Sequence, residues 1–263
     1  MHFHFDFSAS NVLWTITFAA ELVLLVVLLG RDRARRFPWF TANIVLLALL
    51  LLVSRMLLNR MPAVPASIIF LVLSCIATLV SWIVVAEVAR RGFARASGRS
   101  WLNATIVTLV IAGVVVWLWG PWPAWKTFAG GSRIATMRGM GMFADKGSVL
   151  VNVLQIELAI LLVLFGRRYR GGWRYHPQMI AIGLSTAALS QLSIRGIWQY
   201  LASHTIIHSQ TEYLRMMTLR ERMYHANNVV YLCVLVWWIA WLWLEEPGTQ
   251  GSVIANQEVE QGG

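Results

Sequence analysis

Long apolar runs separated by short polar connections dominate the pattern along this chain. Seven apolar segments of spanning length stand out, at residues 10–30, 38–59, 67–89, 102–120, 147–166, 178–203 and 226–244. A hydrocarbon core of about 30 Å needs about 20 helical residues to cross it. The runs do not alternate between apolar and polar positions, as strands of a membrane barrel would. The pattern predicts an all-α polytopic membrane protein, a seven-transmembrane-helix bundle forming one domain over residues 1–244.

Arginine is concentrated in three short connections that fall on the same side of this predicted bundle. The positive-inside rule places those connections in the cytoplasm, so the N-terminus is expected outside and the C-terminus inside. The expected location is the bacterial cytoplasmic (inner) membrane. These residues are Arg31, Arg33, Arg35, Arg36, Arg90, Arg91, Arg95, Arg99, Arg167, Arg168, Arg170 and Arg174.

The other connections and the tail carry less structure in this prediction. Residues 121–146 are expected to form a long outer loop that begins with Gly120-Pro121-Trp122-Pro123. Residues 204–225 are expected to form a short amphipathic helix on the outer membrane surface. Residues 245–263 are polar and are expected to be a disordered cytoplasmic tail. The first apolar run follows no basic n-region, so it is expected to remain as a helix and not to be cleaved.

The composition agrees with a membrane protein, and this changes how the net positive charge is interpreted. The chain is 58% hydrophobic and 13% charged, with a formal net charge of +10, whereas soluble domains carry about 25% charged residues. Because the cytoplasmic arginines account for most of the positive balance, it indicates topology and affinity for anionic lipid. No nucleic acid is expected as a partner.

Five ionisable residues fall inside the predicted spans: Glu21, Arg55, Glu87, Glu157 and Arg195. A charge at mid-bilayer costs about 2.5–3.5 kcal/mol on insertion scales, so such groups should face inward and find partners. Depth along the helices predicts an ion pair between Arg195 and Glu157, and a second between Arg55 and Glu21. Glu87 lies close enough to the cytoplasmic end to reach the arginines that follow it.

Polar side chains accompany the first of these predicted pairs. Gln191, Arg195 and Gln199 recur every four residues on one helix face, and Asn152 and Gln155 precede Glu157 by a turn or so. Two interpretations stay open: a water-lined pocket open to the outside, or a buried polar network that holds the helices in register. The candidate residues for ligand binding or for this network are Glu21, Arg55, Asn152, Gln155, Glu157, Gln191, Arg195 and Gln199.

Histidines and methionines gather on the predicted outer side. Thioethers with imidazoles suit copper(I), and imidazole pairs also suit zinc, although outer histidines are commonly solvated and methionines commonly fill apolar gaps. The histidine pair at 204 and 208 lacks the glutamate of the His-Glu-x-x-His motif. No other cofactor is predicted. The candidate metal ligands are His2, His4, Met137, Met140, Met142, His204 and His208.

Two cofactor classes are excluded by what the predicted spans lack. No histidine lies mid-span, which excludes a bis-histidine haem in the bundle core. No lysine lies in any predicted span, and none lies in the seventh, where a rhodopsin holds retinal. Cys75 and Cys233 are interpreted as small apolar residues and not as a disulfide framework.

The start of the chain carries a family resemblance. A helix with Trp14 and Glu21 is followed by Leu28-Leu29-Gly30-Arg31 and by Arg35-Arg36-Phe37-Pro38-Trp39-Phe40. These residues resemble the first fifth of a group of bacterial seven-transmembrane-helix proteins with no assigned activity. The overall layout also resembles the seven-helix sensor halves of some bacterial signalling proteins, without their cytoplasmic output domain.

These observations lead to one functional hypothesis and two alternatives. The first is a non-enzymatic membrane protein that senses or binds a small ligand in an outer-facing polar pocket, or serves as a subunit of a larger assembly. Its partners would be the bilayer and a second protein or a second copy of itself. The alternatives are a small-molecule or ion transporter using the Glu157/Arg195 centre, and a protein handling copper or zinc at the outer face.

Overall fold

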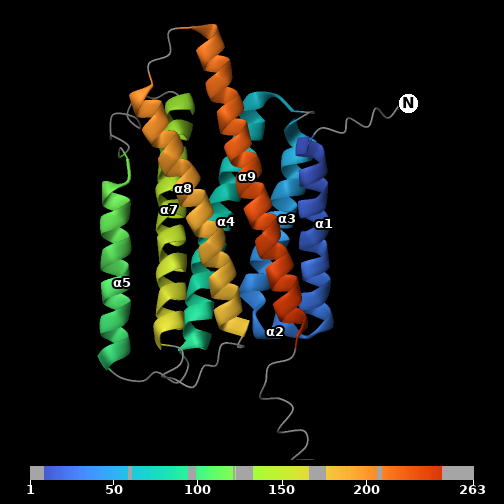
Figure 1. Ribbon diagram of the computed structural model, residues 1–263, viewed down its shortest axis with the longest axis vertical. Helices are drawn as coiled ribbons and strands as arrows, with labels where there is room; N and C mark the ends of the chain where they lie inside the picture. The colour runs from blue at the N-terminus through green and yellow to red at the C-terminus, as the bar shows by residue number, and fades with distance from the viewer. Residues whose placement is uncertain are drawn as a thin grey trace, which may run out of the picture.

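The computed structural model describes residues 9–58, 61–93, 99–120, 122, 133–165, 176–205 and 209–244, and this part of the chain is helical, without strands (Figure 1). The helices are α1 (Ala9–Gly30), α2 (Arg33–Arg36), α3 (Pro38–Leu58), α4 (Ala63–Gly92), α5 (Arg99–Leu118), α7 (Arg133–Phe165), α8 (His176–His204) and α9 (Gln210–Trp243).

Six of these helices are long and apolar enough to cross a membrane, namely α1, α3, α4, α7, α8 and α9. Large apolar side chains remain exposed along them, including Val26 at 67% and Leu164 at 65%. Soluble monomers rarely expose contiguous apolar surface on this scale. The prediction of a multi-pass helical membrane protein is therefore confirmed. In α5 the apolar stretch runs over Thr105–Leu118 and is shorter than the other six.

The six long helices form a closed ring. Each packs against its two neighbours, in the order α1, α3, α4, α7, α8, α9 and back to α1, and α4 also contacts α8. Helix α5 stands outside the ring and packs on α7, which places it at the edge of the bundle (Figure 1). The helices alternate in direction, so the described arginines of α2, α4 and α5 lie at one end, which we call the arginine end.

The apolar core lies in the half of the ring next to the arginine end. It is built from the last turns of α1, α4, α7 and α9 and the first turns of α3 and α8. Two of its aromatic members, Trp238 and Phe40, meet edge to face with ring centroids 5.0 Å apart. Gly183 makes room for Trp238, because a Cβ at this position would lie 2.6 Å from the indole Cε2. Apart from a smaller apolar cluster between α5 and α7, the opposite half of the ring has few buried apolar residues.

One intramembrane carboxyl group accepts a hydrogen bond from the first turn of α3. Helix α3 begins at Pro38, and the preceding Phe37 has no side chain that can accept a hydrogen bond from the first free N–H groups. The buried Glu87 of α4 supplies this acceptor, since the Phe40 N–H donates to its Oε2 at 3.0 Å. Arg91 lies 3.5 Å from Oε1 of the same carboxyl, so Glu87 joins two helices at the arginine end.

The structure corrects two predicted connections. Helix α7 begins at Arg133, inside what we predicted as an outer loop over 121–146. Helix α9 begins at Gln210 and continues unbroken to Trp243, so residues 210–225 do not form a separate helix on the membrane surface. With 34 residues, α9 is about 51 Å long. It therefore projects beyond its neighbours at the end away from the arginines (Figure 1).

The extension of α7 also brings a lysine into an apolar helix, where we predicted none. Lys146 is 8% exposed. Its Nζ donates to the carbonyl oxygens of Val116, at 3.3 Å, of Trp119, and of Gly120, at 3.1 Å. These carbonyls lie at the end of α5, where the last carbonyls of a helix lack their usual N–H partners, and a cation is favourable there. Lys146 thus fastens α5 to the ring. A rhodopsin remains excluded only because α9, the helix that would hold retinal, has no lysine.

Candidate functional site

The ring encloses a polar cavity in the half that the apolar core leaves unfilled. This interior cavity has a volume of about 490 Å³ and is lined by residues of all six ring helices. Trp238 and Leu184, which belong to the apolar core, also line the cavity and form its floor toward the arginine end. The cavity is therefore closed on that side by packed apolar side chains.

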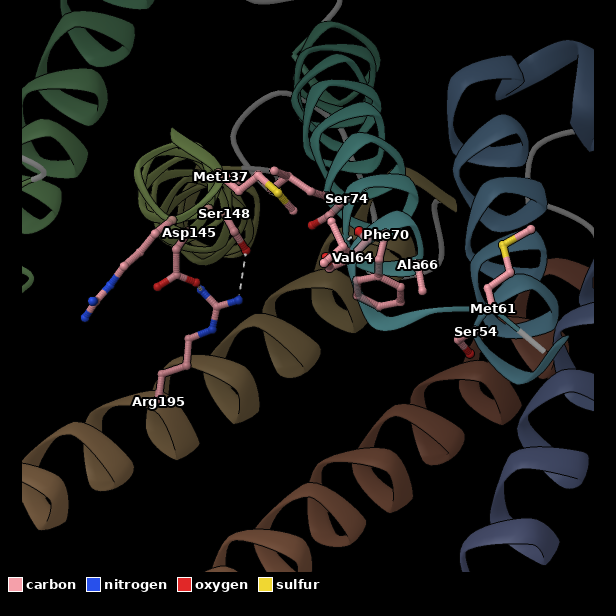
Figure 2. Close-up of a pocket in the computed structure, with 15 residues that line it drawn as sticks. Ser54, Met61, Val64, Ala66, Phe70, Ser74, Met137, Asp145, Ser148 and Arg195 are labelled. Atoms are coloured by element: carbon pink, nitrogen blue, oxygen red, sulfur yellow. Dashed lines mark hydrogen bonds and ion pairs between the residues drawn. The ribbon is translucent and has the colours of Figure 1, made fainter. Parts of the chain in front are cut away.

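A larger cavity, the vestibule, lies toward the opposite end of the bundle. It has a volume of about 1120 Å³ and is bordered by α4, α7 and α8, with a contribution from α3 (Figure 2). Ser54, Phe70, Ser74 and Ser148 line both the vestibule and the interior cavity. Because the two cavities share these lining residues, the interior cavity adjoins the vestibule on the side away from the arginine end.

Hydrogen bonds between polar side chains join neighbouring ring helices around the interior cavity. On α9, the Tyr231 hydroxyl donates to Glu21 Oε1 of α1 at 3.0 Å. On α4, the Ser81 hydroxyl donates to Asn43 Oδ1 of α3 at 3.2 Å. All four residues line the cavity. Glu21 was predicted from the sequence, whereas the other three were not, because they are isolated polar residues in long apolar helices.

The other side of the ring repeats this arrangement. Asn152 Nδ2 of α7 donates to Gln191 Oε1 of α8 at 3.2 Å, and the Ser190 hydroxyl of α8 donates to Asn227 Oδ1 of α9 at 2.9 Å. Asn152, Gln191 and Asn227 line the cavity, as does Gln155. The two interpretations left open by the sequence therefore coincide here: the same side chains connect the helices and present amides to an internal space.

Arg195 lies at the vestibule and does not pair with Glu157 as we predicted. Its Nη1 is 2.9 Å from Asp145 Oδ1, and its Nη2 donates to the Ser148 hydroxyl at 3.3 Å (Figure 2). Both partners belong to α7. Asp145 was missed because it fell in the predicted loop, and Glu157 is 12 positions further along α7, about 18 Å away.

Glu157 is isolated from the cavities. Both of its carboxyl oxygens are shielded from solvent and have no hydrogen-bond partner among the described residues. It is not among the described residues that line the interior cavity or the vestibule. The predicted centre made by Glu157 and Arg195 therefore does not exist as a pair, and Glu157 leaves the candidate site.

The second predicted ion pair is also wrong. The exposed guanidinium of Arg55 lies over the Trp14 ring, with Cζ 5.8 Å from the ring centroid. Glu21 bonds to Tyr231 instead. Gln199 is separated from the cavity as well, since it packs against Gly120 at the end of α5. Of the predicted stripe on α8, only Gln191 faces the interior cavity and Arg195 the vestibule.

The candidate metal ligands do not converge in the described part of the chain. Met137 lines the vestibule, and Met140 is 49% exposed. Met142 is half-buried. The His204 ring stacks on Tyr200 of its own helix, with centroids 4.3 Å apart. His2, His4 and His208 lie outside the described residues. Among those described, no group of three or more His, Cys, Asp or Glu side chains has the spacing for a metal ion, and the outer metal site stays a prediction.

The arrangement offers polar groups to a molecule of limited size. Amide groups, hydroxyls and one carboxyl surround a closed-ended space that is wide enough for a small organic molecule. The chain matches no protein-family model, no curated protein and no solved structure. The geometry of the cavity therefore carries the functional argument alone.

Proposed function

We propose that this chain is a seven-span protein of the bacterial inner membrane that binds a small polar molecule from the outer side, without transforming it. The observation that carries the proposal is the polar interior cavity, which adjoins the vestibule and ends on an apolar floor. A space of this shape admits a ligand from one side of the membrane. It suits a sensor, or the ligand-binding subunit of a larger assembly.

The arginines and α5 support the proposed orientation. Helix α5 has 20 residues, about 30 Å, which matches a bilayer core and supports a seventh span, although its apolar stretch, Thr105–Leu118, is shorter than those of the other six. An odd number of spans puts the two ends of the chain on opposite sides. With the arginine end in the cytoplasm, the N-terminus and the vestibule are outside.

Accessibility of single cysteines tests the one-sided cavity. In a background with Cys75→Ser and Cys233→Ser, we compare Ala187→Cys with Ala181→Cys, two alanines of α8. Ala187 lines the interior cavity, whereas Ala181 is 1% exposed in the apolar core. A small, membrane-impermeant maleimide applied to intact cells should label residue 187 and not residue 181. Equal labelling of both, or labelling of 187 only in inverted vesicles, would contradict the proposal.

A flux measurement distinguishes a transporter from a binding protein. A transporter would have to open the floor made by Trp238 and the core around it, and a binding protein keeps that floor closed. The test uses a ligand that co-purifies with the protein. Its internal concentration in reconstituted vesicles should be no higher than in empty vesicles. Accumulation of that ligand would replace binding with transport as the function.

A further inference from the structure

One carboxyl oxygen in the interior cavity has no partner. Glu21 is 0% exposed and lines the cavity. Its Oε1 accepts a hydrogen bond from the Tyr231 hydroxyl at 3.0 Å. Its Oε2 has no hydrogen-bond partner among the described residues. A buried acceptor is normally satisfied by protein or by a bound molecule, so this oxygen marks a position for a donor that enters the cavity.

The charge of the cavity lining indicates what kind of donor fits. Glu21 is the only acidic residue among the described residues that line the interior cavity, and no Lys, Arg or His is among them. The guanidinium of Arg195 lines the vestibule and not the interior cavity, and it is engaged by Asp145. The protein thus offers Glu21 a hydroxyl and no cation. A buried carboxylate without a cation is strongly disfavoured, so a cationic ligand would complete this site.

The remaining surfaces around Glu21 suit a cation as well. Tyr231 lines the same cavity, and aromatic faces attract ammonium groups. Carboxamide oxygens, such as those of Asn228 and Gln155, can accept further N–H donors. An anionic ligand would find a carboxyl group and no basic side chain at the closed end of the cavity.

We propose that the interior cavity takes a molecule carrying a protonated amine, whose N–H group donates to Glu21 Oε2 beside the Tyr231 hydroxyl. This inference rests on the proposed function, because the amine must enter through the vestibule. It names the chemical class of the ligand: an organic ammonium compound, as opposed to a neutral polar molecule or an organic anion.

Three benzene derivatives of similar size, one cationic, one neutral and one anionic, test the ligand class. Benzylamine, benzyl alcohol and benzoate are titrated calorimetrically into the full chain in lipid nanodiscs, with empty nanodiscs subtracted. We expect benzylamine to bind at least about tenfold more tightly than the alcohol, and benzoate to bind most weakly, since a buried charge pair contributes more than one power of ten in affinity. Benzylamine that binds no more tightly than the alcohol overturns the inference.

Two variants test whether the preference for benzylamine depends on Glu21. Glu21→Gln keeps the shape and removes the charge, and we expect it to weaken benzylamine at least about tenfold while leaving the alcohol unchanged. Glu157→Gln is the matched control, because Glu157 is also an intramembrane glutamate and lies away from the cavity; it should leave both affinities unchanged. An equal loss in both variants overturns the inference. If Glu21→Gln does not fold, the comparison of probes on the natural sequence still decides.

Failure of this inference is separable from failure of the proposed function. If Ala187→Cys is labelled from outside but benzylamine has no preference, the cavity is open and the ligand class is wrong. If Ala187→Cys is not labelled, the outward-facing cavity itself is wrong, and the amine site falls with it.

Discussion

Arg195 of α8 and Asp145 of α7 form an ion pair at the vestibule, with Nη1 2.9 Å from Oδ1. Asp145 lies on the part of α7 that precedes the predicted fifth span. The two side chains are 34% and 64% exposed, so the pair lies at the rim of the bundle. Arg195, which we predicted to pair with Glu157, is therefore neutralised by a carboxylate that lies two helical turns or more nearer the outer end than Glu157.

A double-mutant cycle should detect this pair and not the one predicted from depth. Arg195→Gln and Asp145→Asn should show a coupling free energy of unfolding of about 1 kcal/mol or less, as exposed pairs do. Arg195→Gln and Glu157→Gln should show coupling near zero. Reversible unfolding in mixed micelles measures both cycles. Stronger coupling of Arg195 to Glu157 than to Asp145 would contradict the arrangement.

Removing the lysine that holds α5 should loosen that helix selectively. Lys146→Met removes the ammonium donor that three carbonyl oxygens at the end of α5 share, and it should lower the free energy of unfolding by about 1–3 kcal/mol. Amide hydrogen exchange should rise in α5 and stay unchanged in α1. Arg138→Gln, an exposed cation on the same helix, is the control and should have little effect. Unchanged exchange in α5 after Lys146→Met would show that the lysine does not fasten it.

Glu87 should act through its acceptor oxygen. Glu87→Ala removes the partner of the Phe40 N–H and should lower the free energy of unfolding by about 1–3 kcal/mol, whereas Glu87→Gln retains an acceptor and should lower it less. Asp32→Asn is the control, because Asp32 makes only an exposed contact with Arg35 at 3.5 Å and asparagine tolerates its positive φ of 52°. Equal losses for Glu87→Ala and Glu87→Gln would indicate that charge, not capping, is what matters.

Alanine at two glycines should have opposite effects. Gly183→Ala places a Cβ against the Trp238 indole, and we expect a loss of about 1–3 kcal/mol from overpacking, larger than the gain in helix propensity. Gly113→Ala in α5 meets no atom within 4 Å and should be neutral or stabilising. Thermal unfolding followed by tryptophan fluorescence distinguishes the two. Stabilisation by Gly183→Ala would show that the floor of the cavity is not tightly packed.

Much of the fold could be predicted because the bilayer makes simple demands. A run of apolar residues long enough to cross it must be helical, since backbone groups find no partners in lipid. The helical character and the alternating connections were therefore predictable. The start of α7 was not, because Gly139, Gly141, Asp145 and Lys146 interrupt the apolar pattern that marks a span, although these residues are helical.

The candidate site was predicted only in part. Glu21, Asn152, Gln155 and Gln191 line the interior cavity, as their polar character in a span indicated. Their partners could not be identified, because Glu21 and Tyr231 are separated by 210 positions and belong to the first and last helices. Position in the sequence fixes the depth of a residue along a helix axis. It does not fix which neighbour the residue faces.

The sequence by itself determined the helical class, the approximate depth of each intramembrane polar group and the end of the bundle that carries the arginines, because each depends on the chain's own periodicity and composition. Only the tertiary structure decided the closed order of the six ring helices, the pairing of Arg195 with Asp145 and of Glu21 with Tyr231, and the floor that closes the cavity. These depend on the rotation of each helix about its axis, which is set by side chains packing between helices distant in the chain.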